Sequence, residues 1–220
     1  MELLDGVEVR VLGTLLEKEA TTPYYYPLSL HALMNACNQK SNREPVVNYT
    51  ENDVSDAILR LRDKKLAVAI TDSGRVSKYG QRISETLNLG RRELAVLCTL
   101  LLRGPQTLGE IKDRSERMYA FAELAEAERV LEKLAEWPGG DLVTKLARRP
   151  GQKEARYTHL LAGEPATVAE TGTETASTRS SPLEQLQEEV RQLRASLDEL
   201  RNRFDQFQAE FRRSRLSATE

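Results

Sequence analysis

The segment Tyr26–Val54, YPLSLHALMNACNQKSNREPVVNYTENDV, decides the fold because it joins two helical patterns through a polar turn. Ser29 is placed to cap a helix that runs through Cys37, and Thr50 with Asp53 forms a capping box before the next helix. The residues between these helices are mostly polar and include a proline, which interrupts helices. This order predicts a helix-turn-helix.

Elements on both sides of this segment extend it to a winged-helix order. Upstream, residues 5–18 carry apolar side chains at helical spacing, and the prolines of TTPYYYP end that helix. Downstream, Leu66–Thr71 and Val76–Tyr79 are β-type runs separated by a glycine-containing turn, which predicts a hairpin. For the three tyrosines of TTPYYYP we consider two interpretations: they line a small pocket, or they pack between two repeats.

The pattern recurs in the second part of the chain. Val96–Leu101 aligns with Val11–Leu16, and Thr107–Ile111 aligns with Ser29–Leu33. A third helical stripe and a second pair of β-type runs follow in the same order. The sequence therefore predicts a mostly helical α+β fold with two tandem winged-helix domains, residues 1–88 and 89–163.

The composition changes after the second repeat. Residues 164–181 are rich in Gly, Pro, Ala, Thr, Ser and Glu, which predicts a disordered linker. Residues 182–213 follow a heptad pattern, which favours a coiled-coil helix and a homodimer over a single amphipathic helix that packs back on its own domains. The predicted dimerisation positions are Leu183, Leu186, Val190, Leu193, Leu197, Leu200, Phe204, Phe207 and Phe211.

Composition limits the classes of function. The chain has 220 residues and a formal net charge of −2, and residues 1–163 hold 24 basic against 23 acidic side chains, so any nucleic-acid footprint must be a local patch. The start of the chain lacks the pattern of a signal peptide, and the longest apolar run is far short of a membrane span. We therefore expect a cytoplasmic protein with no membrane association and two reduced, buried cysteines.

Several motifs carry a resemblance to a known family. They are TTP at 21–23 with YPLSLHALMNACNQKSNREPVVN at 26–48, VSKYGQR at 76–82, ELAVLCTLLLRGPQTLGEI at 93–111, RMYAF at 117–121 and LARRPGQKEARYTHL at 146–160. On these residues the chain resembles the YceH-like family of uncharacterised bacterial proteins, although His31 stands where the family pattern has Asn. The resemblance implies two winged-helix domains and brings no activity with it. The family motif comprises Asn38, Gln39, Lys40, Asn42, Arg43 and Pro45.

We find no residue set for catalysis or metal binding. The two histidines, His31 and His159, lie far apart in sequence, and the chain has no CxxC or HxxxH spacing. There is no glycine-rich phosphate loop at a strand-to-helix junction, and no nucleophile has an evident base partner. We expect a protein that is not an enzyme and that needs no cofactor.

Two functions remain close to even. The first is association with duplex DNA through basic residues at the turn and the wings, with the candidate contacts Lys40, Arg43, Arg75, Lys78, Arg82, Arg148, Arg149, Lys153 and Arg156. The second is a protein-interaction scaffold whose third helices bind a protein partner. In the third helix of the first repeat, the outward positions are Asn52, Asp56, Leu59 and Asp63. They favour the second function, because acidic side chains weaken DNA binding. An ordinary solvated rim accounts for the basic residues equally well, and for the Asn38–Arg43 turn we favour a structural contribution.

Overall fold

The computed structural model describes residues 2–70, 76–148 and 154–164. These residues belong to one compact unit, Met1–Thr167, in which about half of the described chain is helical and two small antiparallel sheets complete a mixed α+β fold. The predicted linker, apart from Glu164, and the predicted heptad tract at 182–213 lie outside the described residues. The coiled coil therefore stays a prediction.

The first half of the unit contains the predicted helices and hairpin. In chain order it consists of α1 (Gly6–Thr21), a 3-10 turn (Pro23–Tyr25), β1 (Leu28–Ser29), α2 (Leu30–Cys37), α3 (Glu51–Asp63), β2 (Ala67–Ile70) and β3 (Lys78–Gln81). The Ser29 cap and the Thr50–Asp53 capping box are both present, as predicted. The strand order is β1-β3-β2, with Ala69 opposite Tyr79.

The second half has the same order of elements. After the short helix α4 (Ile83–Thr86) come α5 (Arg91–Arg103), β4 (Gln106–Thr107), α6 (Leu108–Ser115), α7 (Leu124–Ala135), β5 (Val143–Lys145) and β6 (Arg156–His159). Its sheet has the order β4-β6-β5, which matches the first sheet strand for strand. The internal repeat predicted from sequence is thus confirmed in the order of helices and strands.

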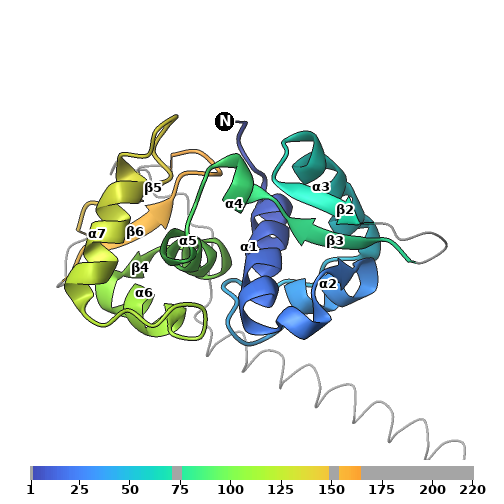
Figure 1. Ribbon diagram of the computed structural model, residues 1–220, viewed down its shortest axis with the longest axis horizontal. Helices are drawn as coiled ribbons and strands as arrows, with labels where there is room; N and C mark the ends of the chain where they lie inside the picture. The colour runs from blue at the N-terminus through green and yellow to red at the C-terminus, as the bar shows by residue number, and fades with distance from the viewer. Residues whose placement is uncertain (1, 71–75, 149–153, 165–220) are drawn as a thin grey trace, which may run out of the picture. The chain divides into compact units, whose positions relative to one another are not determined.

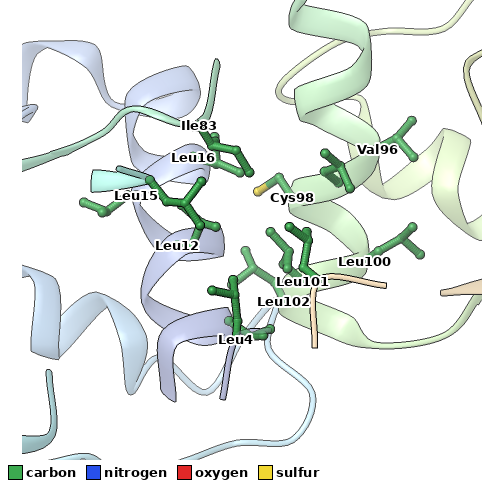
Figure 2. Close-up of a cluster of buried hydrophobic side chains, with 14 of the residues drawn as sticks. Leu4, Leu12, Leu15, Leu16, Ile83, Val96, Cys98, Leu100, Leu101 and Leu102 are labelled. Atoms are coloured by element: carbon green, nitrogen blue, oxygen red, sulfur yellow. The ribbon is translucent and has the colours of Figure 1, made fainter. Parts of the chain in front are cut away.

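The two halves share a core at α1 and α5, which lie side by side (Figure 1). The sequence predicted that α1 buries one apolar face, but every residue from Glu8 to Glu17 is buried, because α5 covers the face that the first half leaves open. Leu16 of α1 and Leu101 and Leu102 of α5 lie between the two helices, whereas Leu15 points to the other side of α1 (Figure 2). A helix that is buried all round is typical of a protein interior.

The close approach of these helices depends on Gly13. A Cβ atom at this position would lie 2.9 Å from Cδ2 of Leu102 and 3.0 Å from Cβ of Leu101, closer than packed side chains allow. The backbone carbonyl of Gly13 also accepts a hydrogen bond from Sγ of Cys98, at 3.3 Å. The absent side chain therefore lets α5 pack directly on the backbone of α1.

Among the described residues, no helix is long and apolar enough to span a bilayer.

Candidate functional site

The structure separates the predicted DNA contacts into three groups. Lys40, Lys78, Arg82 and Arg148 are exposed, and Arg156 is half-buried. Arg43 is buried, with no exposed side-chain surface. Arg75, Arg149 and Lys153 lie outside the described residues. The tips of both predicted wings therefore lie outside the described residues, and Lys78, Arg82, Arg148 and Arg156 lie on the strands and loops that flank them.

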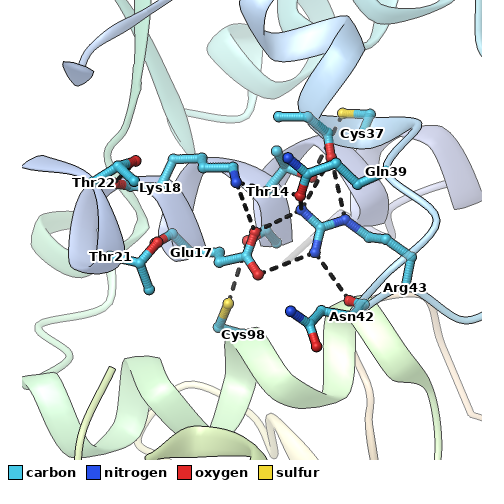
Figure 3. A network of polar contacts seen from close by, with 12 residues as sticks. Thr14, Glu17, Lys18, Thr21, Thr22, Cys37, Gln39, Asn42, Arg43 and Cys98 are labelled. Atoms are coloured by element: carbon cyan, nitrogen blue, oxygen red, sulfur yellow. Dashed lines mark hydrogen bonds and ion pairs between the residues drawn. The ribbon is translucent and has the colours of Figure 1, made fainter. Parts of the chain in front are cut away.

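Arg43 corrects the sequence-based interpretation. Its guanidinium donates to both carboxylate oxygens of Glu17 on α1, with Nη1–Oε1 at 3.1 Å and Nη2–Oε2 at 2.6 Å (Figure 3). It also donates from Nε and Nη2 to the backbone carbonyl of Ala36 near the end of α2, at 3.3 and 3.0 Å. A side chain enclosed in this way is not available to a phosphate backbone, so Arg43 leaves the set of DNA contacts.

The electrostatics of this pair are those of a structural ion pair. Burial raises the pKa of Glu17, but the hydrogen bonds and the charge of Arg43, with a smaller contribution from Lys18, outweigh burial and hold that pKa below its ordinary value. Glu17 is therefore ionised at neutral pH. Lys18 also contacts Oε1 of Gln39 at 3.3 Å, which ties the turn to α1 a second time.

Other residues of the family motif also stabilise the turn. The side chain of Asn38 pairs with the backbone of Tyr49, donating to its carbonyl and accepting from its N–H at 2.8 Å each. Asn42 accepts a hydrogen bond from Arg103 on α5, and the carbonyl of Pro45 accepts from Arg10 on α1 at 2.6 Å. These direct contacts thus support the structural interpretation of the Asn38–Arg43 turn.

Sequence reasoning missed two partners in this network, Arg10 and Glu17. Arg10 is 4% exposed and donates to the carbonyls of Cys37 and Pro45, so it satisfies backbone groups at both ends of the turn. The signal was present in the sequence: these two charged residues interrupt an apolar stretch of α1 at a spacing of seven, which places them on one face of the helix. Charges inside such a run indicate buried partners elsewhere in the chain.

The remaining basic residues lie near the β3 and β6 strands. Lys78 and Arg148 are exposed and have no ion-pair partner among the residues that the structure describes. Arg82 pairs with Glu85 at 3.3 Å on the surface, and Arg156 donates to the carbonyl of Pro105 at 3.1 Å. Lys78 and Arg148 are thus the described wing cations that remain uncompensated.

The third helix of each half presents an acidic surface. On α3, the predicted outward residues Asn52, Asp56, Leu59 and Asp63 are all exposed, and half of the surface of Leu59 is accessible. On α7, Glu126 accepts hydrogen bonds from the Tyr119 hydroxyl at 2.9 Å and the Ala122 N–H at 3.0 Å. The RMYAF motif therefore helps to fix the start of α7.

Neither interpretation of the three tyrosines holds as a whole. Tyr24 and Tyr25 are 98% and 80% exposed, so they neither line a pocket nor pack between the halves. Only Tyr26 packs against the core, and its hydroxyl accepts a hydrogen bond from the Gln81 N–H at 2.5 Å. The 3-10 turn at Pro23–Tyr25 directs the first two rings into solvent.

The described histidines and cysteines do not form a reactive or metal-binding group. His31 is exposed and lies 3.0 Å from Glu51, whereas His159 is half-buried, and its buried Nδ1 atom has no hydrogen-bond partner in the described part of the chain. Burial raises the pKa of the Cys37 thiol to about 11 and also raises that of Cys98, which keeps both thiols protonated. Within the described ranges no cluster of three or more His, Cys, Asp or Glu side chains could hold a metal ion.

A pocket that the sequence did not indicate lies between α1 and α5. Its volume is about 380 Å³, within the range of small-molecule sites. A second, narrower pocket of about 40 Å³ shares Met118 with it and is rich in arginine. Both depend on the packing of one half against the other, which local sequence patterns do not encode.

Comparison with known proteins identifies the family. The family model described as "Protein of unknown function, DUF480" matches residues 4–152, which cover all the helices and both sheets except β6. The chain belongs to the DUF480 family. It is 49% identical over 217 residues to a "UPF0502 protein" of Pelobacter propionicus, covering 92% of this chain and 99% of that relative. A "UPF0502 protein" of Geotalea daltonii is 56% identical over 168 residues, which cover 76% of each chain. The resemblance drawn from the motifs agrees with this family of uncharacterised bacterial proteins.

Proposed function

We propose that this DUF480 chain is a non-enzymatic, dimeric tandem winged-helix protein that associates with duplex DNA through its wings. The order of elements in each half, with a hairpin after the third helix, supports the winged-helix assignment. The observation that carries the DNA proposal is the position of the uncompensated cations. Lys78 on β3 and Arg148 after β5 are exposed, have no ion-pair partner in the described chain, and adjoin the wing tips.

The proposed contact uses the wings and keeps the third helices away from the phosphates. Asp56 and Asp63 on the outer face of α3 would repel a phosphate backbone and would reduce the gain from counterion release. The same holds for the exposed glutamates of α7, such as Glu132. Lys78 and Arg148, unlike Arg82, have no ion-pair partner among the described residues, so they supply the attraction.

The test is binding to random-sequence duplex DNA over a salt series, measured by fluorescence anisotropy. Charge reversal at both Lys78 and Arg148 should lower affinity at least tenfold, and replacing two phosphate contacts should reduce the slope of log K against log salt by about 2. The matched control reverses Arg62 and Arg129, two exposed cations on the third helices. Equal losses in both double variants, or no loss in the wing variant, would refute wing-led binding.

A protein-interaction scaffold is the second candidate, favoured by Leu59. This side chain is half exposed on α3 between the carboxylates of Asp56 and Asp63, a combination typical of a surface that binds a protein with basic and apolar groups. Leu59→Asp should remove a partner that co-purifies with the full-length protein while the circular dichroism spectrum stays unchanged. Retention of every partner would count against this candidate.

The dimer is proposed to form through the heptad tract. Its core positions, Leu183 to Phe211, lie outside the described residues, so the support comes from the heptad pattern alone. A chain that ends before Leu183 should be monomeric by light scattering, whereas the full chain should have twice its own monomer mass. A dimer of the shortened chain would assign dimerisation to another surface.

A further inference from the structure

The pocket between α1 and α5 has an apolar body. Leu16 and Ala20 line it from α1, and Leu94, Ala95 and Met118 line it from the second half. Its one acidic lining residue is Glu19, which accepts a hydrogen bond from Nε2 of Gln81 at 2.7 Å and whose pKa is raised by burial. The volume of about 380 Å³ is sufficient for the apolar part of a small ligand.

One end of this pocket meets a cluster of arginines. Arg103 of α5 and Arg114 of α6, with Arg117 just beyond α6, line the narrower pocket, and Met118 belongs to the lining of both pockets. The apolar pocket and the arginine-lined pocket therefore adjoin each other at Met118, and we refer to the two together as the groove. Arg91 adds a further exposed cation to the rim of the apolar part.

The arginine end has an excess of positive charge. Glu17 in its lining is already neutralised by Arg43, and Glu110 pairs with Arg114 at 3.3 Å. Arg117 has no ion-pair partner among residues 2–70, 76–148 and 154–164, and the Arg103 guanidinium donates to the neutral amide oxygen of Asn42. Burial lowers the pKa of Arg103, and the charges of Arg114 and Arg43 lower it further, while Glu17 and Glu44 oppose this shift.

We propose that this groove is a binding site for an amphipathic organic anion, with an aliphatic body between α1 and α5 and a carboxylate or phosphate monoester on Arg103 and Arg117. Charge complementarity selects this occupant over a neutral one, because an uncharged ligand would leave Arg103 and Arg117 without an ion-pair partner within the described chain. A guanidinium binds either anion through paired N–H groups. The site does not depend on the proposed DNA contacts, which lie on other elements.

The position of the site gives the ligand a structural consequence. It contacts α1 of the first half and α5 and α6 of the second, so a bound molecule would connect the two halves through surfaces that belong to both. A ligand that binds only the packed arrangement stabilises it by mass action. Binding should therefore raise the thermal midpoint of the full-length protein.

The experiment is isothermal titration calorimetry of the full-length protein with octanoate, octyl phosphate and octanol. We expect saturable binding of one molecule per chain for at least one of the two anions, and at least tenfold weaker binding of octanol. Preference for octanoate or for octyl phosphate identifies the head group. Two outcomes would overturn the proposal. The first is that neither anion binds saturably, which is the result expected if a segment of protein occupies the groove. The second is that octanol binds as tightly as the anions.

Two variants locate the binding. Arg117→Glu should weaken binding of the anion at least tenfold, and Ala20→Trp should fill the apolar part and abolish binding. Both positions are exposed, which favours retention of the fold, to be checked by circular dichroism. Arg129→Glu, on the surface of α7, is the matched control and should bind normally. If Ala20→Trp does not fold, the test rests on Arg117→Glu alone. Unchanged anion affinity in Arg117→Glu would refute the assigned site.

Discussion

Replacing Arg43 with methionine should destabilise the protein strongly, because the change leaves the carboxylate of Glu17 buried without its partner. The side chain of Arg43 has no exposed surface, and its two bonds to Glu17 measure 2.6 and 3.1 Å. Removal of one member of such a pair costs about 3–5 kcal/mol. With a urea m-value of about 2 kcal/mol/M for a domain of this size, the midpoint should fall by about 1.5–2.5 M.

A surface pair provides the control for this measurement. Arg82 and Glu85 lie 3.3 Å apart with both side chains more than half exposed, so Arg82→Met should cost less than about 1 kcal/mol. The double variant Arg43→Met with Glu17→Gln should be more stable than Arg43→Met alone, since it also removes the uncompensated charge. The assay is urea unfolding followed by circular dichroism, with the coupling energy taken from the complete double-mutant cycle.

The pH dependence gives an independent check. The folded-state pKa of Glu17 lies below its ordinary value of 4.5, so the contribution of the pair is complete above that pH and is lost as pH falls through the folded-state pKa. In Arg43→Met, burial raises the pKa of Glu17 without the opposing arginine, so the variant recovers stability as Glu17 takes up a proton. The stability difference between the native protein and Arg43→Met should therefore begin to shrink above pH 4.5 and continue to shrink as the pH falls further. The reasoning fails if Arg43→Met costs less than 1 kcal/mol at pH 7, or if the double variant is as unstable as the sum of the single ones.

Three further predictions concern the α1–α5 contact, a half-buried histidine and the tyrosine turn. Gly13→Ala should destabilise by about 1–3 kcal/mol through overpacking, while Gly109→Ala, where no atom lies within 4 Å of the added Cβ, should be neutral or stabilising by up to about 1 kcal/mol in urea unfolding. His159 has a pKa held at about 4 by burial, below its ordinary 6.5, so stability should fall as pH drops from 6.5 towards 4, by at most about 3 kcal/mol, and His159→Phe should flatten that part of the profile. Tyr25→Ser should change the thermal midpoint little, whereas Tyr26→Phe should lower stability by about 1 kcal/mol; equal effects would contradict the exposures described.

Local sequence patterns predicted the helices, their caps and the repeat. The caps at Ser29 and Thr50 are set by residues within three positions, and the apolar stripe of α3 follows helical spacing, so both can be derived without knowledge of distant contacts. The outward face of α3 was predicted for the same reason. These features depend on interactions inside one element or between neighbouring elements.

Contacts between distant segments could not be predicted in the same way. The positive charge of Arg43 suggested a surface residue, and only the fold brings Glu17, twenty-six positions earlier, against it. The groove between α1 and α5 likewise requires both halves, and a sequence pattern that describes each half separately leaves it out. Tyr24 and Tyr25 show the opposite limitation: their aromatic character suggested burial, but the 3-10 turn exposes them.

The contact between Gly13 and Cys98 has a consequence for the symmetry of the molecule. These two residues occupy equivalent positions in the repeat, since Val11–Leu16 aligns with Val96–Leu101, and they touch each other through a hydrogen bond. Equivalent residues meet in this way at the axis of a two-fold homodimer. The packing of α1 on α5 thus has the form of a self-complementary dimer interface enclosed within one chain. A separated half would expose that apolar helix face, and pairing with a second copy of itself is the arrangement that would cover it again.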